Sequence, residues 1–214
     1  AIVAEIMEEI TSPLVHFKAY LRHGYLPFGS IKGNEQDYLA RVFKIIDACL
    51  AYDLAFINDY SAEHQSKIKK LLGILSETVP YIPNTLKLAT QLQIGRNTLL
   101  MLLQHLEQAS LIHLIHKTGK GFSVLQKPDK ITIENTNFCY ALSNAPDESS
   151  IREIFIVNQL KNAGKNVEIS DTADYRIDGK ITVEIGGKSK KKKQIKEGLK
   201  WKRSGLSSPT EGMN

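Results

Sequence analysis

Three acidic residues in the last third of the chain have the types and the order that a divalent-metal site requires. Glu153 lies on a stretch with helical spacing, and Asp174 and Glu184 lie on two strand-like runs that follow it. Carboxylate oxygens are the ligands that a hard cation such as Mg²⁺ prefers. A cation held by these three carboxylates would polarise a phosphodiester and activate water. This order therefore predicts a metal site suited to hydrolysis of a nucleic-acid backbone.

The order Glu, Asp, Glu resembles the PD-(D/E)XK nuclease pattern, in which a lysine follows the last acid by two residues. Here that position is Gly186, and the next lysine lies beyond a Gly-Gly pair. Without a cation at that position, the attacking water and the developing negative charge lose their stabiliser. We therefore expect a degenerate nuclease-like domain. Its candidate catalytic residues are Glu153, Asp174, Glu184 and the displaced Lys188.

Each acid also has an ordinary structural interpretation. Ser150 and Glu153 have the spacing of a capping box, so Glu153 can bind backbone amides at a helix start. Asp174 can be a solvated acid at the beginning of a strand, and Glu184 can point outward from an amphipathic strand. These readings predict three unrelated surface acids instead of a site.

The turn between the last two strand-like runs decides whether Asp174 and Glu184 can meet. Asp178-Gly179 is a strong hairpin signal, and a two-residue turn there would place the two acids on opposite faces. A three-residue loop, 177–179, with Gly179 left-handed in a bulge, would place them on one face. We expect the bulged form.

The middle of the chain has the pattern of a winged helix-turn-helix. Asn84 can cap a helix, Gly95 marks a sharp turn, and a second helix opens near Asn97 or Thr98. That second helix has a buried leucine stripe at 99, 102, 103 and 106. Two strand-like runs, 111–116 and 122–125, then flank a Gly-Lys-Gly tip. Two helices joined by a tight turn, followed by a hairpin, predict this fold.

A winged helix contacts DNA or a protein through the exposed side of its second helix and through its wing. Arg96, Asn97 and Gln104 suit base edges, whereas two large apolar groups on the same side suit a protein. Residues 62–130 contain nine Lys or Arg against four acids, which favours nucleic acid. The candidate contact residues are Arg96, Asn97, Leu100, Met101, Gln104, Lys117 and Lys120.

Composition limits the other classes. The chain has 214 residues, 42% of them hydrophobic, with a net charge of +5 and a pI near 9.0. Nine Lys or Arg against two acids after residue 187 supply all of the positive excess. No apolar run is long enough to span a membrane, no leader is evident, and two distant cysteines form no disulfide framework. We expect a cytoplasmic protein, and nothing in the sequence specifies its oligomeric state.

The chain as a whole resembles the C-terminal half of bacterial and archaeal AAA-type ATPases of the predicted archaeal ATPase group. The resemblance covers about nine-tenths of the chain and is carried by six segments: 16–28, 95–98, 103–112, 127–143, 151–161 and 174–196. It implies an α+β fold in four parts. These are a helical segment (1–61) after a missing ATPase core, the winged helix (62–130), the PD-(D/E)XK-like α/β domain (131–196) and a basic, disordered tail (197–214).

The resemblance also implies how the chain is used. The parent would bind ATP and Mg²⁺ in a module absent here, and would move the winged helix and the nuclease-like domain against a partner. The sequence GGKS at 186–189 resembles the end of a phosphate-binding loop, but the first glycine of that motif would lie at position 182, which is Thr182. This chain therefore has no phosphate-binding loop of its own. We therefore expect a recognition and docking portion without a cofactor. The alternatives are a metal-dependent nuclease and a winged-helix DNA-binding regulator.

Overall fold

The computed structural model describes residues 12–30, 33–53, 62–78, 81–117, 126–143 and 145–186. Several predicted features lie outside this part of the chain: the helical run before residue 12, the wing tip with Lys120, the second wing strand at 122–125, Lys188 and the tail at 197–214. Within it, helices and two small antiparallel sheets alternate, which confirms the α+β class. None of the described helices is long and apolar enough to cross a membrane.

The N-terminal part consists of two helices joined by a short turn. α2 (Pro13–His23) begins at its proline, where the missing N–H of proline costs nothing, and it leads to the 3₁₀ turn η1 (Pro27–Ser30). α3 (Glu35–Ala48) is capped by Asn34, whose side chain accepts from the Asp37 N–H, and it ends in the π turn η2 (Cys49–Asp53).

The middle part contains three helices and a hairpin. α5 (Ala62–Thr78), α6 (Thr85–Leu92) and α7 (Arg96–Gln108) precede β1 (Ile112–Ile115) and β2 (Lys130–Ile133). The two strands pair antiparallel, with Ile112 opposite Ile133. Tyr81, between α5 and α6, adds a one-residue bridge to Ile131 on the outer side of β2, with backbone hydrogen bonds of 3.0 and 2.9 Å. The order is therefore helix, bridge, helix, helix and hairpin.

The turn between α6 and α7 differs from the prediction in one respect. The left-handed residue is Gln93, with φ of 52°, whereas Gly95 is extended and forms the N-cap of α7. Glycine has no side chain with which to cap a helix, so the first N–H groups of α7 receive no side-chain acceptor. Asn84 caps α6 as predicted, accepting from the Lys87 N–H.

The C-terminal part adds two helices and a second sheet. α8 (Thr136–Leu142) and α9 (Glu148–Asn162) precede β3 (Val167–Ile169), β4 (Tyr175–Ile177) and β5 (Ile181–Val183), which pair antiparallel in that order. The two sheets meet at a parallel bridge between Lys117 and Ile169, with the Ile169 N–H donating to His116 O at 2.9 Å. The second sheet therefore continues from the end of the β1–β2 hairpin.

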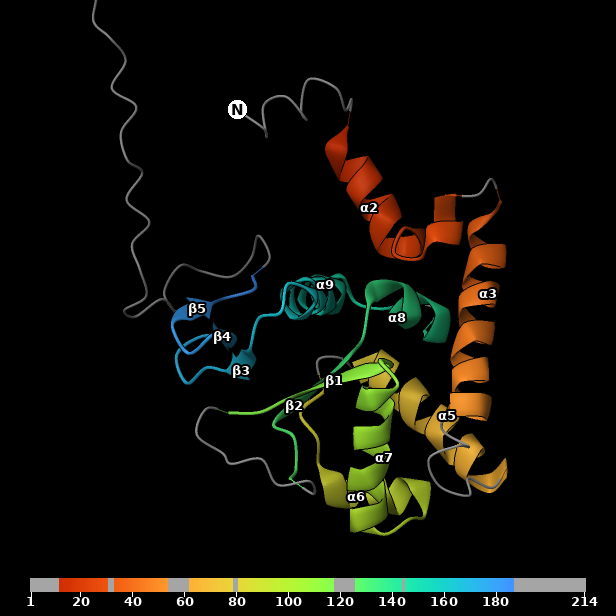
Figure 1. Cartoon of the computed structure of the whole chain (residues 1–214), viewed down its shortest axis with the longest axis vertical. Helices are drawn as coiled ribbons and strands as arrows, with labels where there is room; N and C mark the ends of the chain where they lie inside the picture. Colours follow the sequence, from red (N-terminus) through yellow and green to blue (C-terminus); the bar gives the residue numbers. More distant parts are fainter. Residues whose placement is uncertain are drawn as a thin grey trace, which may run out of the picture.

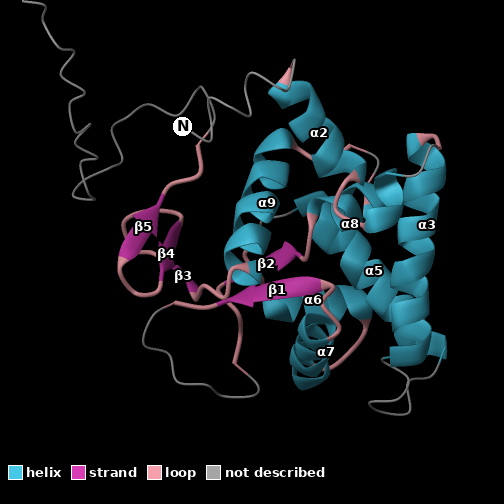
Figure 2. Ribbon diagram, turned by 45° about the horizontal axis from the view of Figure 1, so that its top comes forward, coloured by secondary structure: helices cyan, strands magenta, loops and turns pink. Residues whose placement is uncertain are grey.

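α9 covers the face of the hairpin that α7 leaves open. Figures 1 and 2 both show the hairpin between α9 on one side and α6 and α7 on the other. Alternate residues of β1 divide accordingly: Ile112 and Leu114 belong to the large core cluster, and Ile115 to a smaller one with Val157. The large cluster includes residues of α2, α3 and α5 to α9, so it crosses the predicted boundaries at 61 and 130.

A buried asparagine joins the N-terminal part to the rest. Asn137, at the start of α8, accepts from the Tyr25 N–H at 2.8 Å and from the Tyr38 hydroxyl. Its amide donates to the carbonyls of Tyr20 and Leu21. A fully buried amide with this many partners specifies one geometry, because any other arrangement would leave polar groups unpaired.

Candidate functional site

The outward face of α7 consists of Asn97, Met101, Gln104 and Gln108, which follow one another at helical spacing. Asn97, Met101 and Gln108 are exposed and Gln104 is half-buried. Met101 is the exposed large apolar side chain of α7, with 43% of its surface accessible. Arg96, also exposed, opens the helix beside the uncapped N–H groups. This face was predicted, except for Gln108.

Leu100 does not belong to this face, and the prediction that it does is wrong. Its exposed fraction is 2%, because the buried arc of α7 is wider than the predicted stripe. Leu100 lies at the edge of that arc, inside the large core cluster. The outward face of α7 is therefore mainly polar, with one apolar group instead of two.

The lysines of α5 already have partners in the chain. Lys67 and Lys70 of α5 donate to the carbonyls of Gln93 and Gln91 at the end of α6, at 3.4 and 3.1 Å. A cation there stabilises the negative end of the helix. Lys69 forms an ion pair with Asp47 at 2.8 Å. These three lysines therefore hold α5 against its neighbours and are not free for a ligand.

Two exposed cations remain on α6 and α7. In the described ranges, the side chains of Lys87 on α6 and Arg96 on α7 form no hydrogen bond or ion pair. Lys117, a predicted wing contact, lies 3.4 Å from Asp171 through its ammonium, and its backbone N–H donates to Asp129 Oδ2 at 2.9 Å. Lys87 and Arg96 are thus the cations best placed to hold a phosphate.

Glu153, the first of the three candidate metal ligands, is held by two residues that the sequence did not indicate. Its Oε1 lies 2.6 Å from Lys130 Nζ and accepts a hydrogen bond from the Tyr175 hydroxyl. Lys130 Nζ also lies 4.6 Å from the centre of the Tyr175 ring, in a cation–π contact. Burial and the adjacent carboxylate raise the pKa of the Tyr175 hydroxyl, so it stays a donor.

Glu153 is also not a helix cap, contrary to the alternative interpretation. α9 begins at Glu148, and its cap is Asp147, whose side chain accepts from the N–H groups of Ser149 and Ser150. Glu153 therefore lies in the second turn of α9, where its side chain points at the sheets instead of at the helix start.

The hairpin register places Asp174 and Glu184 on one face. Ile177 pairs with Ile181, so three residues, 178–180, connect the strands instead of two. Gly179 is left-handed with φ of 67°, as predicted, and Asp178 is left-handed as well. The predicted three-residue loop is therefore confirmed, but it lies one residue later than expected. Continuing this register by one pair sets Asp174 opposite Glu184.

Glu153 nevertheless lies on the other side of that sheet. Neighbouring residues of a strand point to opposite faces, and the Tyr175 side chain reaches Glu153, so Asp174 points away from it. Asp174 Oδ2 instead accepts the Ile185 N–H at 2.7 Å. Across the described ranges, no group of three or more His, Cys, Asp or Glu side chains is placed to hold a metal ion. The structure thus does not assemble the predicted three-carboxylate metal site.

A second buried polar cluster lies farther along the interface between the hairpin and α9. His113 Nε2 lies 3.1 Å from Glu134 Oε2 without a hydrogen bond between them, and the contact is an ion pair only when His113 is protonated. The Asn158 amide donates to Glu134 Oε1 at 3.4 Å. Burial lowers the pKa of His113 to about 4 and raises that of Glu134 to about 7; the Lys161 charge lowers both.

The alternation of polar and apolar residues along β2 is the sequence feature that indicates both buried clusters. Lys130, Thr132 and Glu134 share one face of the strand, whereas Ile131 and Ile133 share the other. Read locally, such a strand has a solvated polar face. Here α9 covers that face, so each charge needs a partner.

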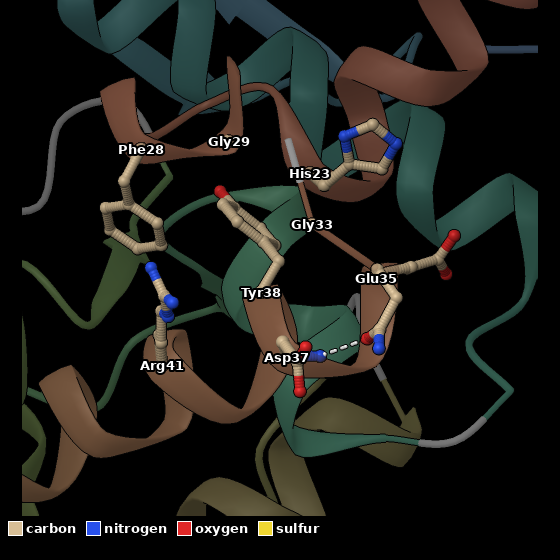
Figure 3. A pocket seen from close by; sticks show the side chains of 9 residues that line it. His23, Phe28, Gly29, Gly33, Glu35, Asp37, Tyr38 and Arg41 are labelled. Atoms are coloured by element: carbon tan, nitrogen blue, oxygen red, sulfur yellow. Dashed lines mark hydrogen bonds between the residues drawn. The ribbon is translucent and has the colours of Figure 1, made fainter. Parts of the chain in front are cut away.

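A small pocket lies between η1 and α3, apart from these residues. Its volume is about 160 Å³, and Figure 3 shows the rings of His23, Phe28 and Tyr38 around it, with Arg41 at its edge. The Tyr38 ring centre lies 6.0 Å from that of His23 and 5.0 Å from that of Phe28. Gly29 is required here, because a Cβ at this residue would lie 1.7 Å from His23 O. The lining of the pocket includes both acidic and basic side chains.

These features define an α+β protein in which a helix–helix–hairpin unit is joined to a small sheet through α9. No family model matches the chain, and no solved structure matches it. The chain is similar to the uncharacterised protein MJ1637 of Methanocaldococcus jannaschii, with 26% identity over 130 residues. These residues are 61% of this chain and 26% of MJ1637, so the matched region spans about a quarter of that relative.

Proposed function

We propose that this chain is the recognition portion of a longer AAA-type ATPase, and that its middle part is a winged helix that binds duplex DNA. The order of elements supports the winged helix: α5, the Tyr81 bridge, α6, α7 and the β1–β2 hairpin. In that fold the second helix of the pair enters the major groove, and here this helix is α7.

The observation that carries the proposal is the outward face of α7. Its residues are polar apart from Met101, and Arg96 and Asn97 are exposed at the end that approaches base edges in such complexes. Arginine and asparagine form bidentate contacts with guanine and adenine. The uncapped N–H groups of α7 and the ammonium of Lys87 suit adjacent phosphates. With Leu100 buried, the case for a protein partner loses one of its two apolar groups.

The parent protein is inferred from the resemblance given by the sequence. The relative MJ1637 is about four times as long as the region matched to it, which is compatible with a further module. ATP and Mg²⁺ would bind in that module, since this chain has no phosphate-binding loop. Turnover there would move the winged helix and the β3–β5 sheet together, because α9 packs on both.

We do not propose nuclease activity. The three candidate carboxylates divide between two faces of the β3–β5 sheet, and Glu153 is neutralised by Lys130. The β3–β5 part therefore serves the proposed function as a support for the hairpin instead of as a catalyst.

Binding to duplex DNA, followed by fluorescence anisotropy over a range of salt concentrations, tests the proposal. Arg96→Ala should weaken binding about tenfold, as loss of one direct base contact does. Lys44→Ala is the matched control, because Lys44 is an exposed cation on α3, outside the α6–α7 pair. Equal effects of the two substitutions would contradict a role for α7.

The basic run at 190–193 must be separated from the α7 contribution, since a polycation binds DNA by counterion release alone. Changing its four lysines to glutamine should reduce affinity uniformly across sequences and should leave the Arg96→Ala effect in place. Loss of all binding in this variant would make the chain a nonspecific polycation. The upstream reading frame should encode GxxxxGK[ST]; without it, the same DNA-binding surface would belong to a regulator.

A further inference from the structure

The β3–β5 sheet ends in a strand whose outer edge is open within the described part of the chain. β5 pairs with β4 on one side, and none of the described strands pairs with its other side. Figures 1 and 2 both show β5 as the outermost strand of the sheet. Ile181, the first residue of β5, is 52% exposed. An open edge presents unpaired N–H and C=O groups to any strand that fits it.

β5 and the residue on either side of it have a self-complementary order, Lys180-Ile181-Thr182-Val183-Glu184. When two copies run antiparallel with Thr182 opposite the partner's Thr182, each Lys180 lies opposite the partner's Glu184. Each Ile181 then lies opposite the partner's Val183. In this register the numbers of two paired residues differ by an even number, so their side chains lie on the same face of the sheet. Ile181 and Val183 therefore meet on one face, and Lys180, Thr182 and Glu184 meet on the other. Opposite charges directly across two strands attract.

Neighbouring registers of the same pairing are less favourable. Centring the two strands on Ile181 would set Lys180 opposite the partner's Thr182, which gives no ion pair. Centring them on Val183 would set Lys180 opposite the partner's Gly186, which gives no ion pair. The order of residues therefore selects the register centred on Thr182.

We propose that β5 is a dimerisation strand that joins two copies of this chain edge to edge. The two three-stranded sheets would then form one continuous antiparallel sheet across a two-fold axis at Thr182. A contact of one three-residue strand and its two flanking residues per chain is small, so the association should depend on concentration. This inference does not depend on DNA binding.

A charge-reversal series tests the proposed pairing. In sedimentation equilibrium, the mass of the wild-type chain should rise from 24.0 kDa toward twice that value as the concentration increases. Lys180→Glu sets two pairs of like charges across the axis and should raise the dissociation constant about tenfold or more. Glu184→Lys should act similarly, and the double variant Lys180→Glu/Glu184→Lys should restore association. Circular dichroism of each variant checks that the fold is retained.

Cross-linking tests the register independently of charge. Thr182→Cys should form a disulfide across the two-fold axis on mild oxidation, whereas Arg176→Cys, in the central strand β4, should not. Both should carry Cys49→Ser, because Cys49 is only half-buried.

Three results would overturn the proposal. The first is a wild-type chain that stays monomeric throughout the concentration series. The second is a dimer that Lys180→Glu does not weaken. The third is protection of the β5 amides from hydrogen exchange in dilute, monomeric protein, which would show that the chain covers this edge itself.

Discussion

Lys130 Nζ and Glu153 Oε1 lie 2.6 Å apart, with 14% and 13% of their side chains exposed. Lys130 belongs to β2 and Glu153 to α9, so this ion pair joins the β1–β2 hairpin to the C-terminal part. Tyr175 of β4 contacts both residues, which extends the connection to the second sheet. The pair thus lies where the two sheets and α9 meet.

Breaking this pair should destabilise the fold more than loss of an ordinary surface charge. Lys130→Met leaves the Glu153 carboxylate buried without its cation, which costs about 3–5 kcal/mol of unfolding free energy. Urea denaturation measures this loss. The double variant Lys130→Met/Glu153→Met should recover most of it, because replacing both charges leaves none unpaired. Lys44→Met is the exposed control, and an equal loss in that variant would refute the buried pair.

Leu100 distinguishes a core position from a contact surface. Leu100→Ala should cost about 2–5 kcal/mol in the same denaturation experiment, because it opens a cavity in a packed core. Met101→Ala, at the next residue, should cost much less, since its side chain is largely accessible. Similar small losses for both would mean that Leu100 is exposed, as the sequence had suggested.

The pair of His113 and Glu134 should make stability depend on pH. The pKa of Glu134 is raised to about 7 in the fold, so the stability it contributes is fully present below its ordinary pKa of 4.5 and is lost as pH rises through 7. The pKa of His113 is lowered to about 4, so its contribution is present above 6.5 and is lost as pH falls through 4. The two residues therefore act in opposite directions.

Removing one partner exposes the effect of the other. In Glu134→Gln, the free energy of unfolding should fall less between pH 4.5 and 7 than it does in the wild type. At pH 8 the variant should therefore be more stable than the wild type by at least about 1 kcal/mol of unfolding free energy. Denaturation at several pH values provides the comparison, with His113→Gln as the reciprocal variant. An unchanged profile in Glu134→Gln would mean that Glu134 is ionised in the fold at neutral pH.

Asn137 should be a major determinant of how the N-terminal helices attach. Asn137→Ala removes hydrogen bonds to Tyr25 and Tyr38 and leaves buried polar groups unpaired, at a cost of about 2–4 kcal/mol. Thermal unfolding of this variant should be compared with that of Asn97→Ala, an exposed asparagine on α7. If α2 and α3 detach first, unfolding will occur in two steps, whereas two equally stable variants would rule out the proposed role.

Local sequence patterns predicted most helices and strands of the described part. Apolar spacing and caps depend on residues within one or two turns, so β1 lies within the expected run at 111–116 and α7 begins one residue before the expected Asn97. The partner of β1 is β2 at 130–133, whereas the predicted second wing strand at 122–125 lies outside the described residues. Asn84 caps α6, as its position in the sequence indicates. Gly164, which follows α9, has a left-handed backbone, as is common for a glycine that ends a helix. The hairpin loop was expected one residue too early, because turn type depends on both strands that it connects.

Side-chain environments in the candidate sites could not be predicted in this way. Leu100 is buried, and Lys130 meets Glu153, because of contacts between elements that are distant in the sequence. The sequence by itself determined which segments form helices and strands and which charges each carries, since these depend on neighbouring residues. Only the tertiary structure decided that α9 covers the polar face of β2 and that Asp174 points away from Glu153, because packing selects the face that each element buries.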